Sequence, residues 1–358
     1  MVNAILLSRA GLQVTLIEKK NYPHHKVCGE YISNEVSPFL LREGLYPDEL
    51  NPSHIKRFML TSVSGRSSYM PLDLGAFGIS RFAFDQFLYH KALEAGATIL
   101  TNTAVRDTEF QGDRFQLLLP NQKLLSCRLL IGAYGKRSRL DKQLNRRFIT
   151  ERSPYIGVKY HLKTDFPSDL IALHNFEGGY CGISQVEGGR YNMCYLGSRE
   201  GLRQHGSIEA MEKAILHENP YLKRIFNEAT FLFEKPEVIN EISFAPKQPV
   251  EQHILMSGDT AGLITPLCGN GMAMAIHSAK ILSDLIIKYY RPNKPNRKAL
   301  EDAYSQQWNK TFARRLWVGR KVQWLFGSKL VSELGVGLVS NSKIMAEQIM
   351  RRTHGKVF

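Results

Sequence analysis

The stretch that decides the fold of this 358-residue chain is Gly258-Asp259-Thr-Ala-Gly262-Leu-Ile-Thr-Pro266-Leu-Cys-Gly269-Asn270-Gly271. A short apolar run typical of a buried strand precedes it, and small residues typical of a helix follow it from Met272. An aspartate at the end of a strand can present its carboxylate to a polyol hydroxyl, and glycines let the backbone approach a flat ring. The first amides of the helix offer N–H groups to an electron-rich oxygen. The stretch therefore predicts a cofactor site between a strand and a helix.

The N-terminal residues have the pattern of half a dinucleotide-binding unit. Residues 1–10 have helical spacing, Gly11 can end that helix, and residues 12–17 form an apolar, β-branched run that ends at Glu18. An acidic residue at the end of such a strand accepts hydrogen bonds from an adenosine ribose. The glycine-rich phosphate loop lies roughly 20 residues before that acid. We therefore expect an N-terminally truncated Rossmann-like domain whose phosphate loop would precede Met1.

Two further segments carry polar side chains at informative positions. In Lys26-Val-Cys-Gly-Glu30, glycine permits a tight turn next to Cys28. In residues 80–88, Arg81 begins a predicted helix with an apolar face, where its guanidinium could reach a pyrophosphate or a flavin edge. Taken alone, the first segment is a plain surface loop and the second an Arg81–Asp85 pair that fixes a helical turn.

Together these segments resemble the FAD-dependent monooxygenase and geranylgeranyl reductase superfamily over nearly the whole chain. The resemblance implies that Glu18 binds the adenosine ribose and that Lys26 and Arg81 contact the FAD. Val105, expected in a strand beginning near Thr103, would meet the adenine through its backbone.

In the same resemblance, Asp259 binds the ribityl chain and Cys28 matches the cysteine that lies over the flavin in geranylgeranyl reductases. Cys28 is accordingly the one catalytic candidate. The remaining expected cofactor contacts come from the quoted stretch and are Gly258, Gly262, Pro266, Gly269, Asn270 and Gly271.

The segment Gly132-Ala-Tyr134-Gly departs from the family pattern, because many aromatic hydroxylases carry an aspartate at the position of Tyr134. That aspartate is linked to both FAD and NADPH handling in the family. Its replacement weakens the case for direct NADPH use and for a hydroxylase, but not the case for a flavin. FAD is the expected cofactor, and NAD(P)H is a candidate for the transient electron donor.

The fold class expected is α/β, with three parts. An FAD-binding domain is predicted over residues 1–58, 81–150 and 250–290. An inserted β-rich substrate domain is predicted over residues 59–80 and 151–249, where alternating runs such as residues 156–162 and 192–196 indicate antiparallel strands. A basic helical C-terminal extension is predicted over residues 291–358.

The net charge of +14 is concentrated in that extension, where residues 280–358 hold nine Lys and seven Arg against five acidic residues. An apolar stripe at every fourth position predicts a long helix that packs on the catalytic domains with its basic face in water. Tryptophans among the basic residues alternatively indicate a surface that rests on an anionic membrane. Nucleic acid is a poorer partner, since no nucleic-acid motif accompanies the charge. The stripe consists of Leu300, Tyr304, Trp308, Phe312 and Leu316.

Five scattered cysteines favour a cytoplasmic protein with reduced thiols and no metal cluster. We expect an FAD-dependent oxidoreductase that reduces or hydroxylates a lipophilic substrate, of isoprenoid, polyketide-like or aromatic character, with peripheral membrane contact. The alternatives are an NAD(P)H-dependent monooxygenase of a small aromatic compound, or a truncated chain that cannot retain FAD.

Overall fold

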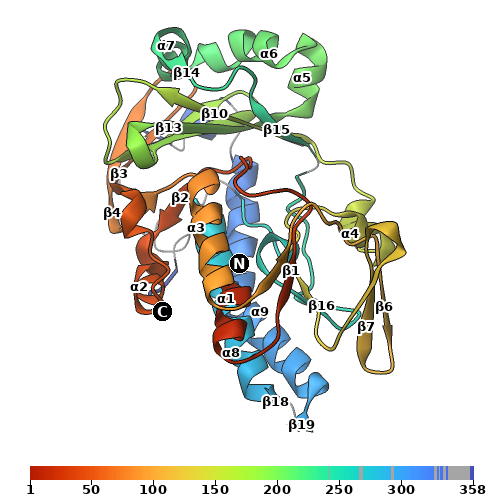
Figure 1. The fold of residues 1–358 in the computed structure, drawn as a ribbon. Helices are drawn as coiled ribbons and strands as arrows, with labels where there is room; N and C mark the ends of the chain where they lie inside the picture. The colour runs from red at the N-terminus through yellow and green to blue at the C-terminus, as the bar shows by residue number, and fades with distance from the viewer. Residues whose placement is uncertain are drawn as a thin grey trace.

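The computed structural model of the chain describes residues 1–240, 242–265, 269–291, 294–325, 329, 331–333, 336–337 and 355–358. Within them, helices α1, α3 and α8 lie side by side beneath a large sheet, and helices α5, α6 and α7 cover the opposite face of that sheet (Figure 1). The helices are α1 (Val2–Arg9), α2 (Ser37–Arg42), α3 (Arg81–Glu94), α4 (Arg139–Gln143), α5 (Arg199–His205), α6 (Ile208–Ala214), α7 (Pro220–Glu228), α8 (Gly271–Tyr289) and α9 (Arg297–Leu325).

The lower half of the molecule contains two short parallel strand pairs, β1 with β5 and β9 with β17. An antiparallel meander, β6-β7-β8, lies beside them (Figure 1). The predicted first helix and strand are confirmed, and Gly11 at φ 81° gives the left-handed residue between them. These strands are β1 (Thr15–Ile17), β5 (Thr98–Leu100), β6 (Asp107–Gln111), β7 (Arg114–Leu118), β8 (Leu124–Cys127), β9 (Ile131–Gly132), β16 (Val250–Glu251) and β17 (Ile254–Met256).

The upper half is a nine-stranded sheet in the order β14-β10-β13-β12-β11-β3-β4-β2, with β15 also paired to β10. The two alternating runs are confirmed as adjacent antiparallel strands, with Tyr160 opposite Met193. Strands β2 and β3 belong to this sheet by their pairing with β4, although both begin within residues 1–58. Its strands are β2 (Tyr31–Ser33), β3 (Ser53–Thr61), β4 (Ser67–Gly78), β10 (Tyr155–Lys163), β11 (Leu170–Phe176), β12 (Gly179–Gln185), β13 (Tyr191–Ser198), β14 (Thr230–Phe231) and β15 (Glu237–Asn240).

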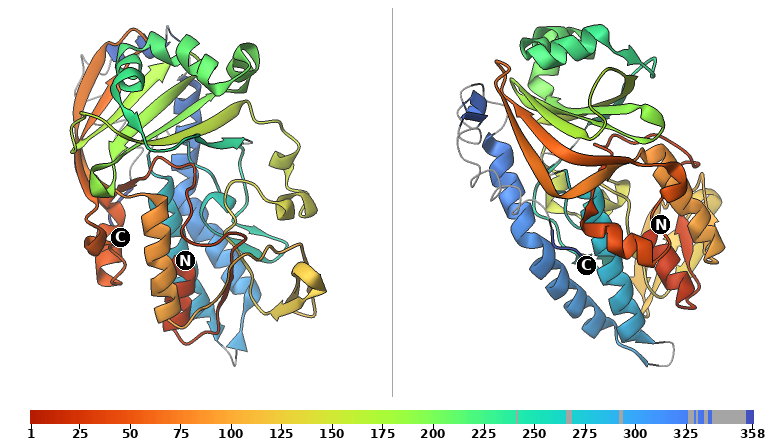
Figure 2. Two further views of the ribbon diagram at one scale, coloured as in Figure 1. Left: turned by 45° about the horizontal axis from the view of Figure 1, so that its top comes forward. Right: turned by 90° about the vertical axis from the view of Figure 1, so that its left-hand side faces the viewer.

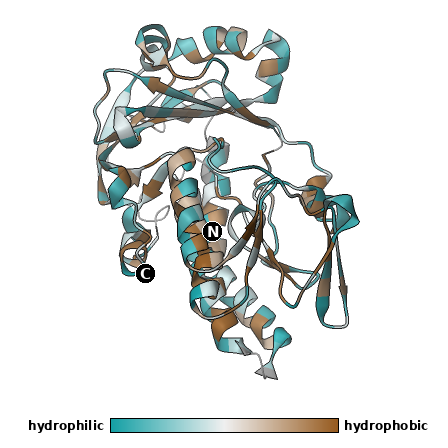
Figure 3. Ribbon diagram, in the orientation of Figure 1, coloured by the Kyte–Doolittle hydropathy of each residue, from teal (hydrophilic) through white to brown (hydrophobic). Residues whose placement is uncertain are grey.

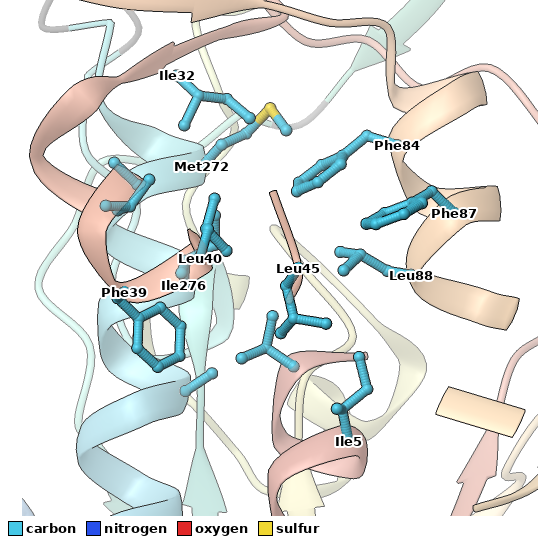
Figure 4. Packing of buried hydrophobic residues seen from close by; sticks show 14 of the residues in the cluster. Ile5, Ile32, Phe39, Leu40, Leu45, Phe84, Phe87, Leu88, Met272 and Ile276 are labelled. Carbon is cyan, nitrogen blue, oxygen red and sulfur yellow. The ribbon is translucent and has the colours of Figure 1, made fainter. Parts of the chain in front are cut away.

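Hydrophobic side chains from four helices fill the space below the large sheet. Ile5 from α1, Phe84 from α3, Phe39 from α2 and Ile276 from α8 point into one cluster (Figure 4). Figure 3 shows hydrophobic residues gathered where these helices meet. Burying one such side chain stabilises the fold by about 1.5–3 kcal/mol, so this cluster fixes the helices that border the cofactor site.

Helix α9 runs along one side of the molecule from the β18–β19 turn toward the large sheet (Figure 2). Its predicted apolar stripe is buried against α8, as the packing interpretation requires. The turn consists of β18 (Tyr290–Arg291) and β19 (Lys294–Pro295). Much of the expected basic end, including residues 351–354, lies outside the described residues. Among the described residues, no helix is long and apolar enough to cross a membrane.

Candidate active site

A cleft of about 2680 Å³ runs from the space between the two parallel strand pairs up to the underside of the large sheet. Its walls come from segments that are distant in the sequence, because β1, α3, the 258–271 stretch and the large sheet all border it. The predicted site residues on its walls are Glu18, Lys26, Cys28, Arg81, Val105, Gly258, Asp259, Gly269, Asn270 and Gly271. The structure thus brings together ten of the residues that the sequence singled out.

Three predicted positions differ from expectation or lie beyond the structure. Val105 borders the cleft, but in an irregular segment between β5 and β6, so the expected strand near Thr103 is wrong. Gly262 does not line this cleft, because a Cβ atom there would lie 2.8 Å from Trp308 and 2.9 Å from Leu316. Its hydrogen-only side chain instead permits the close approach of α9. Pro266 lies outside the described residues.

The Asp259 carboxylate lies on the cleft wall in the 3-10 turn that follows β17 (Gly258–Thr260), and no described residue donates a hydrogen bond to it. Two glycines on the cleft wall leave their backbone open to the cleft, since a Cβ atom on Gly29 or Gly135 would meet nothing within 4 Å. The free carboxylate can accept hydrogen bonds from the hydroxyls of FAD. The backbone at the two glycines can come close to its flat ring. The residues present therefore fit this cofactor.

Glu18 lies at the end of β1, where its carboxylate faces the cleft. It accepts hydrogen bonds from the Lys20 amide (3.0 Å) and the Tyr22 hydroxyl (3.2 Å). Burial, followed by the Glu18 charge, raises the pKa of Tyr22 above its ordinary range, so the phenol stays protonated as a donor. Carboxylates have capacity for about four acceptor contacts, so Glu18 retains capacity for a ribose.

Asp85 forms ion pairs with Arg81 and Lys26, the two residues that were expected to contact the cofactor. Its carboxylate accepts two hydrogen bonds from Arg81, each at 2.8 Å, and one from Lys26 at 2.8 Å. Burial acts against ionisation, but the Arg81 and Lys26 charges hold the pKa of Asp85 below its ordinary value. The Arg81–Asp85 pair expected from the i, i+4 spacing is confirmed, and it fixes Arg81 at the cleft wall.

Lys247 was not singled out from the sequence, yet it ties together the two loops that border the lower cleft. Its ammonium donates to the carbonyls of Lys136 (2.9 Å) and Asp259 (3.0 Å) and lies 4.3 Å from the ring centre of Phe148. Burial lowers the pKa of Lys247 to about 8. No sequence pattern identifies this lysine, because its hydrogen-bond partners are backbone carbonyls, which every residue has.

The lowered pKa of Lys247 predicts how stability changes with pH. The unfolded chain binds more protons than the folded chain between about pH 8 and 10.5, so the free energy of unfolding rises through that window. Relative to Lys247→Met, we expect the wild-type value to increase by about 2 kcal/mol from about pH 7.5 to 9.5. Urea titrations at both pH values measure this difference in the free energy of unfolding. Lys163→Met, at the exposed end of β10, is the control. A pH-independent difference would contradict the assignment.

The upper end of the cleft is apolar where it meets the large sheet. Side chains of three neighbouring strands face it. Val27, Ile239 and Ile242 pack closely over Gly157, where a Cβ atom would lie only 3.0–3.2 Å from them. The apolar lining from β3, β4 and β11 consists of Phe58, Leu60, Met70, Leu72, Ile171 and Leu173. This end suits a hydrocarbon group rather than a charged one.

A cleft that joins a carboxylate-lined dinucleotide end to an apolar sheet defines a flavoprotein oxidoreductase. The chain belongs to the FAD binding domain family, whose sequence model matches residues 1–316. It is an FAD-dependent oxidoreductase.

Related proteins agree with that membership. The chain is 23% identical over 302 residues to a geranylgeranyl diphosphate reductase of Rhodobacter capsulatus, covering 81% of this chain and 72% of the relative. It is 25% identical over 334 residues to a digeranylgeranylglycerophospholipid reductase of Methanocaldococcus jannaschii, covering 84% and 77%. A geranylgeranyl bacteriochlorophyll reductase-like crystal structure from Thermoplasma acidophilum has the same fold, with TM-score 0.78, 18% identity and coverage of 98% and 92%.

Proposed function

We propose that this chain reduces a carbon–carbon double bond in an isoprenoid-like lipid. The observation that carries the proposal is the apolar upper end of the cleft, which adjoins the 26–30 segment through Val27. An isoprenoid chain presents hydrocarbon to this wall along its whole length, whereas a small aromatic compound would cover only part of it. The names of two relatives, both reductases of geranylgeranyl compounds, support the same substrate class.

Each part of the chain has a distinct task in this proposal. Bound FAD, once reduced, would supply the hydride, and a proton from solvent would complete the addition. Asp259 would hold the cofactor's hydroxyls, and Glu18 the ribose. The apolar wall would orient the double bond and exclude water, and Cys28 would border the reacting carbon.

The first test is whether the chain retains FAD. After incubation with FAD and desalting, we expect a visible flavin absorption band. Asp259→Ala should weaken FAD binding by roughly 10–100-fold, because hydrogen bonds to a charged acceptor are lost. Asp284→Ala, in the same region of the chain but on the exposed face of α8 beside Lys280, should leave the affinity unchanged. A wild-type chain without bound FAD would contradict the proposal and support a non-catalytic chain.

The second test concerns the reaction. Holoenzyme reduced under anaerobic conditions is mixed with geranylgeraniol, and the product is analysed by mass spectrometry. We expect addition of two hydrogen atoms. A product carrying an added oxygen in air, with NADPH-stimulated oxygen uptake, would favour the monooxygenase alternative.

We also propose that helix α9 rests on an anionic membrane surface. Its exposed side chains Lys310, Arg314, Trp317 and Lys321 recur on one face, and Trp317 is 56% exposed. Each basic residue near such a surface contributes roughly 1 kcal/mol. Co-sedimentation with phosphatidylserine vesicles should fall at high salt and with a Trp317→Ala, Lys321→Gln double variant. A Lys213→Gln control on α6 should bind as wild type, and no binding at low salt would exclude the proposal.

A further inference from the structure

A buried ionic cluster joins the Cys28 segment to the large sheet. The Glu30 carboxylate accepts hydrogen bonds from Lys159 Nζ (2.5 Å), His161 Nε2 (2.6 Å) and the Arg81 amide (2.7 Å). The Glu30 and Lys159 side chains are both fully buried. Burial works against ionisation, but the His161 hydrogen bond and the Lys159 charge hold the pKa of Glu30 below its ordinary value.

The cluster sits where three elements meet. Lys159 and His161 are two residues apart on β10, so their side chains emerge from the same face of the large sheet. Their partners across the strand pair are Cys194 and Asn192 on β13, so all four positions share that face. Arg81 is the first residue of α3, and Glu30 immediately precedes β2.

The backbone around Cys28 is held at several points by the same face. Asn192 donates to the Cys28 carbonyl at 3.2 Å, and Lys159 donates to the Lys26 carbonyl at 3.2 Å. The Glu30 amide lies 3.5 Å from the Cys28 sulfur. Glu30 itself has φ 52°, a left-handed conformation that a non-glycine residue keeps only where its surroundings enforce it.

Resting on the function proposed above, we propose that Glu30, Lys159 and His161 are positioning residues that fix the Cys28 thiol against the cleft. Stability alone does not explain the arrangement, because an apolar trio of similar volume commonly serves as well as a buried ion pair. A carboxylate with three directed donors instead sets one position for the chain that bears it. Since Lys159 contacts both the Glu30 side chain and the Lys26 carbonyl, the sheet that lines the apolar end also sets the thiol's place.

The decisive variant is Glu30→Gln/Lys159→Met, which removes both charges together and leaves neither partner buried alone. In the full chain, as purified and after loading with FAD, the alkylation rate of Cys28 by iodoacetamide is followed by peptide mass spectrometry, which separates it from the other cysteines. We expect the rate to rise about tenfold, as the loss of hydrogen bonds to a charged group implies. The conservative Lys159→Arg variant should stay close to wild type.

Glu212→Gln is the matched control. Glu212 is also a buried carboxylate packed on the large sheet, where it accepts hydrogen bonds from Tyr160 (2.9 Å) and Tyr195 (2.8 Å). The Glu212→Gln variant should change the alkylation rate of Cys28 by less than about twofold, because distant sites act independently. A folded double variant with the wild-type rate, or an equal rise in Glu212→Gln, would overturn the inference. The result is independent of substrate, so failure of lipid reduction alone would count against the proposed function and not against this cluster.

Discussion

Replacing Gly179 by alanine is expected to lower the free energy of unfolding by about 3 kcal/mol or more, because overpacking against backbone cannot be relieved by a side-chain rotation. A Cβ atom at Gly179 would lie 2.0 Å from the Leu196 carbonyl oxygen and 2.6 Å from the Phe176 ring. Relief requires β12 and β13 to move apart. Leu196 also lines the cleft, so the same shift would disturb the substrate end. Urea unfolding of the purified variant gives the value.

Gly182 supplies a control from the same strand. A Cβ atom there would have its nearest contact at 3.7 Å, on the Cys194 carbonyl, which is an ordinary separation. Gly182→Ala should therefore change the free energy of unfolding by less than about 1 kcal/mol. Equal unfolding midpoints for the two variants would contradict this expectation. They would show that Leu196 and Phe176 can move away from a side chain at Gly179.

Local patterns predicted those parts of the molecule whose partners are near in sequence. The Arg81–Asp85 pair follows from a helical spacing of four, and the α9 stripe follows from the same period. The strand, glycines and Asp259 of the quoted stretch are consecutive, so their arrangement needs no tertiary information. The strand expected at Val105 is wrong, because the segment after β5 does not join a ladder, and no residue pattern signals that outcome.

Long-range pairing explains what the sequence did not reveal. Glu30 is 129 residues from Lys159 and 131 from His161, so nothing local identifies them as partners. In an alternating strand, Lys159 would be assigned to the solvent face. The 26–30 segment covers that face instead, and the lysine becomes fully buried. A charged residue inside a strand of otherwise buried residues is the one signal that could have marked it.

Replacing Arg146 by methionine is expected to lower the free energy of unfolding by about 3–5 kcal/mol. Without the arginine, the buried Asp141 carboxylate loses the charge that compensates it. Arg146 is 2% exposed and bonds Asp141 (2.9 Å), Glu251 (2.5 Å) and the Thr260 carbonyl (3.0 Å). Asp141 is itself fully buried. Thr260 follows Asp259, so the variant should also bind FAD more weakly. Urea unfolding and flavin retention measure the two effects.

The cause of that loss can be separated from a loss of packing. Adding Asp141→Asn removes the stranded charge, so the double variant should recover part of the stability lost by Arg146→Met. Arg224→Met removes an arginine from the exposed i, i+4 pair with Glu228 on α7 and should cost less than about 1 kcal/mol. If Asp141→Asn instead lowers stability further, loss of the hydrogen bonds that Asp141 accepts from the Ser138 amide and the Tyr134 hydroxyl outweighs relief of the stranded charge. FAD retention that falls in step with stability across the series would show that Arg146 acts on the cofactor by fixing the Thr260 carbonyl next to Asp259.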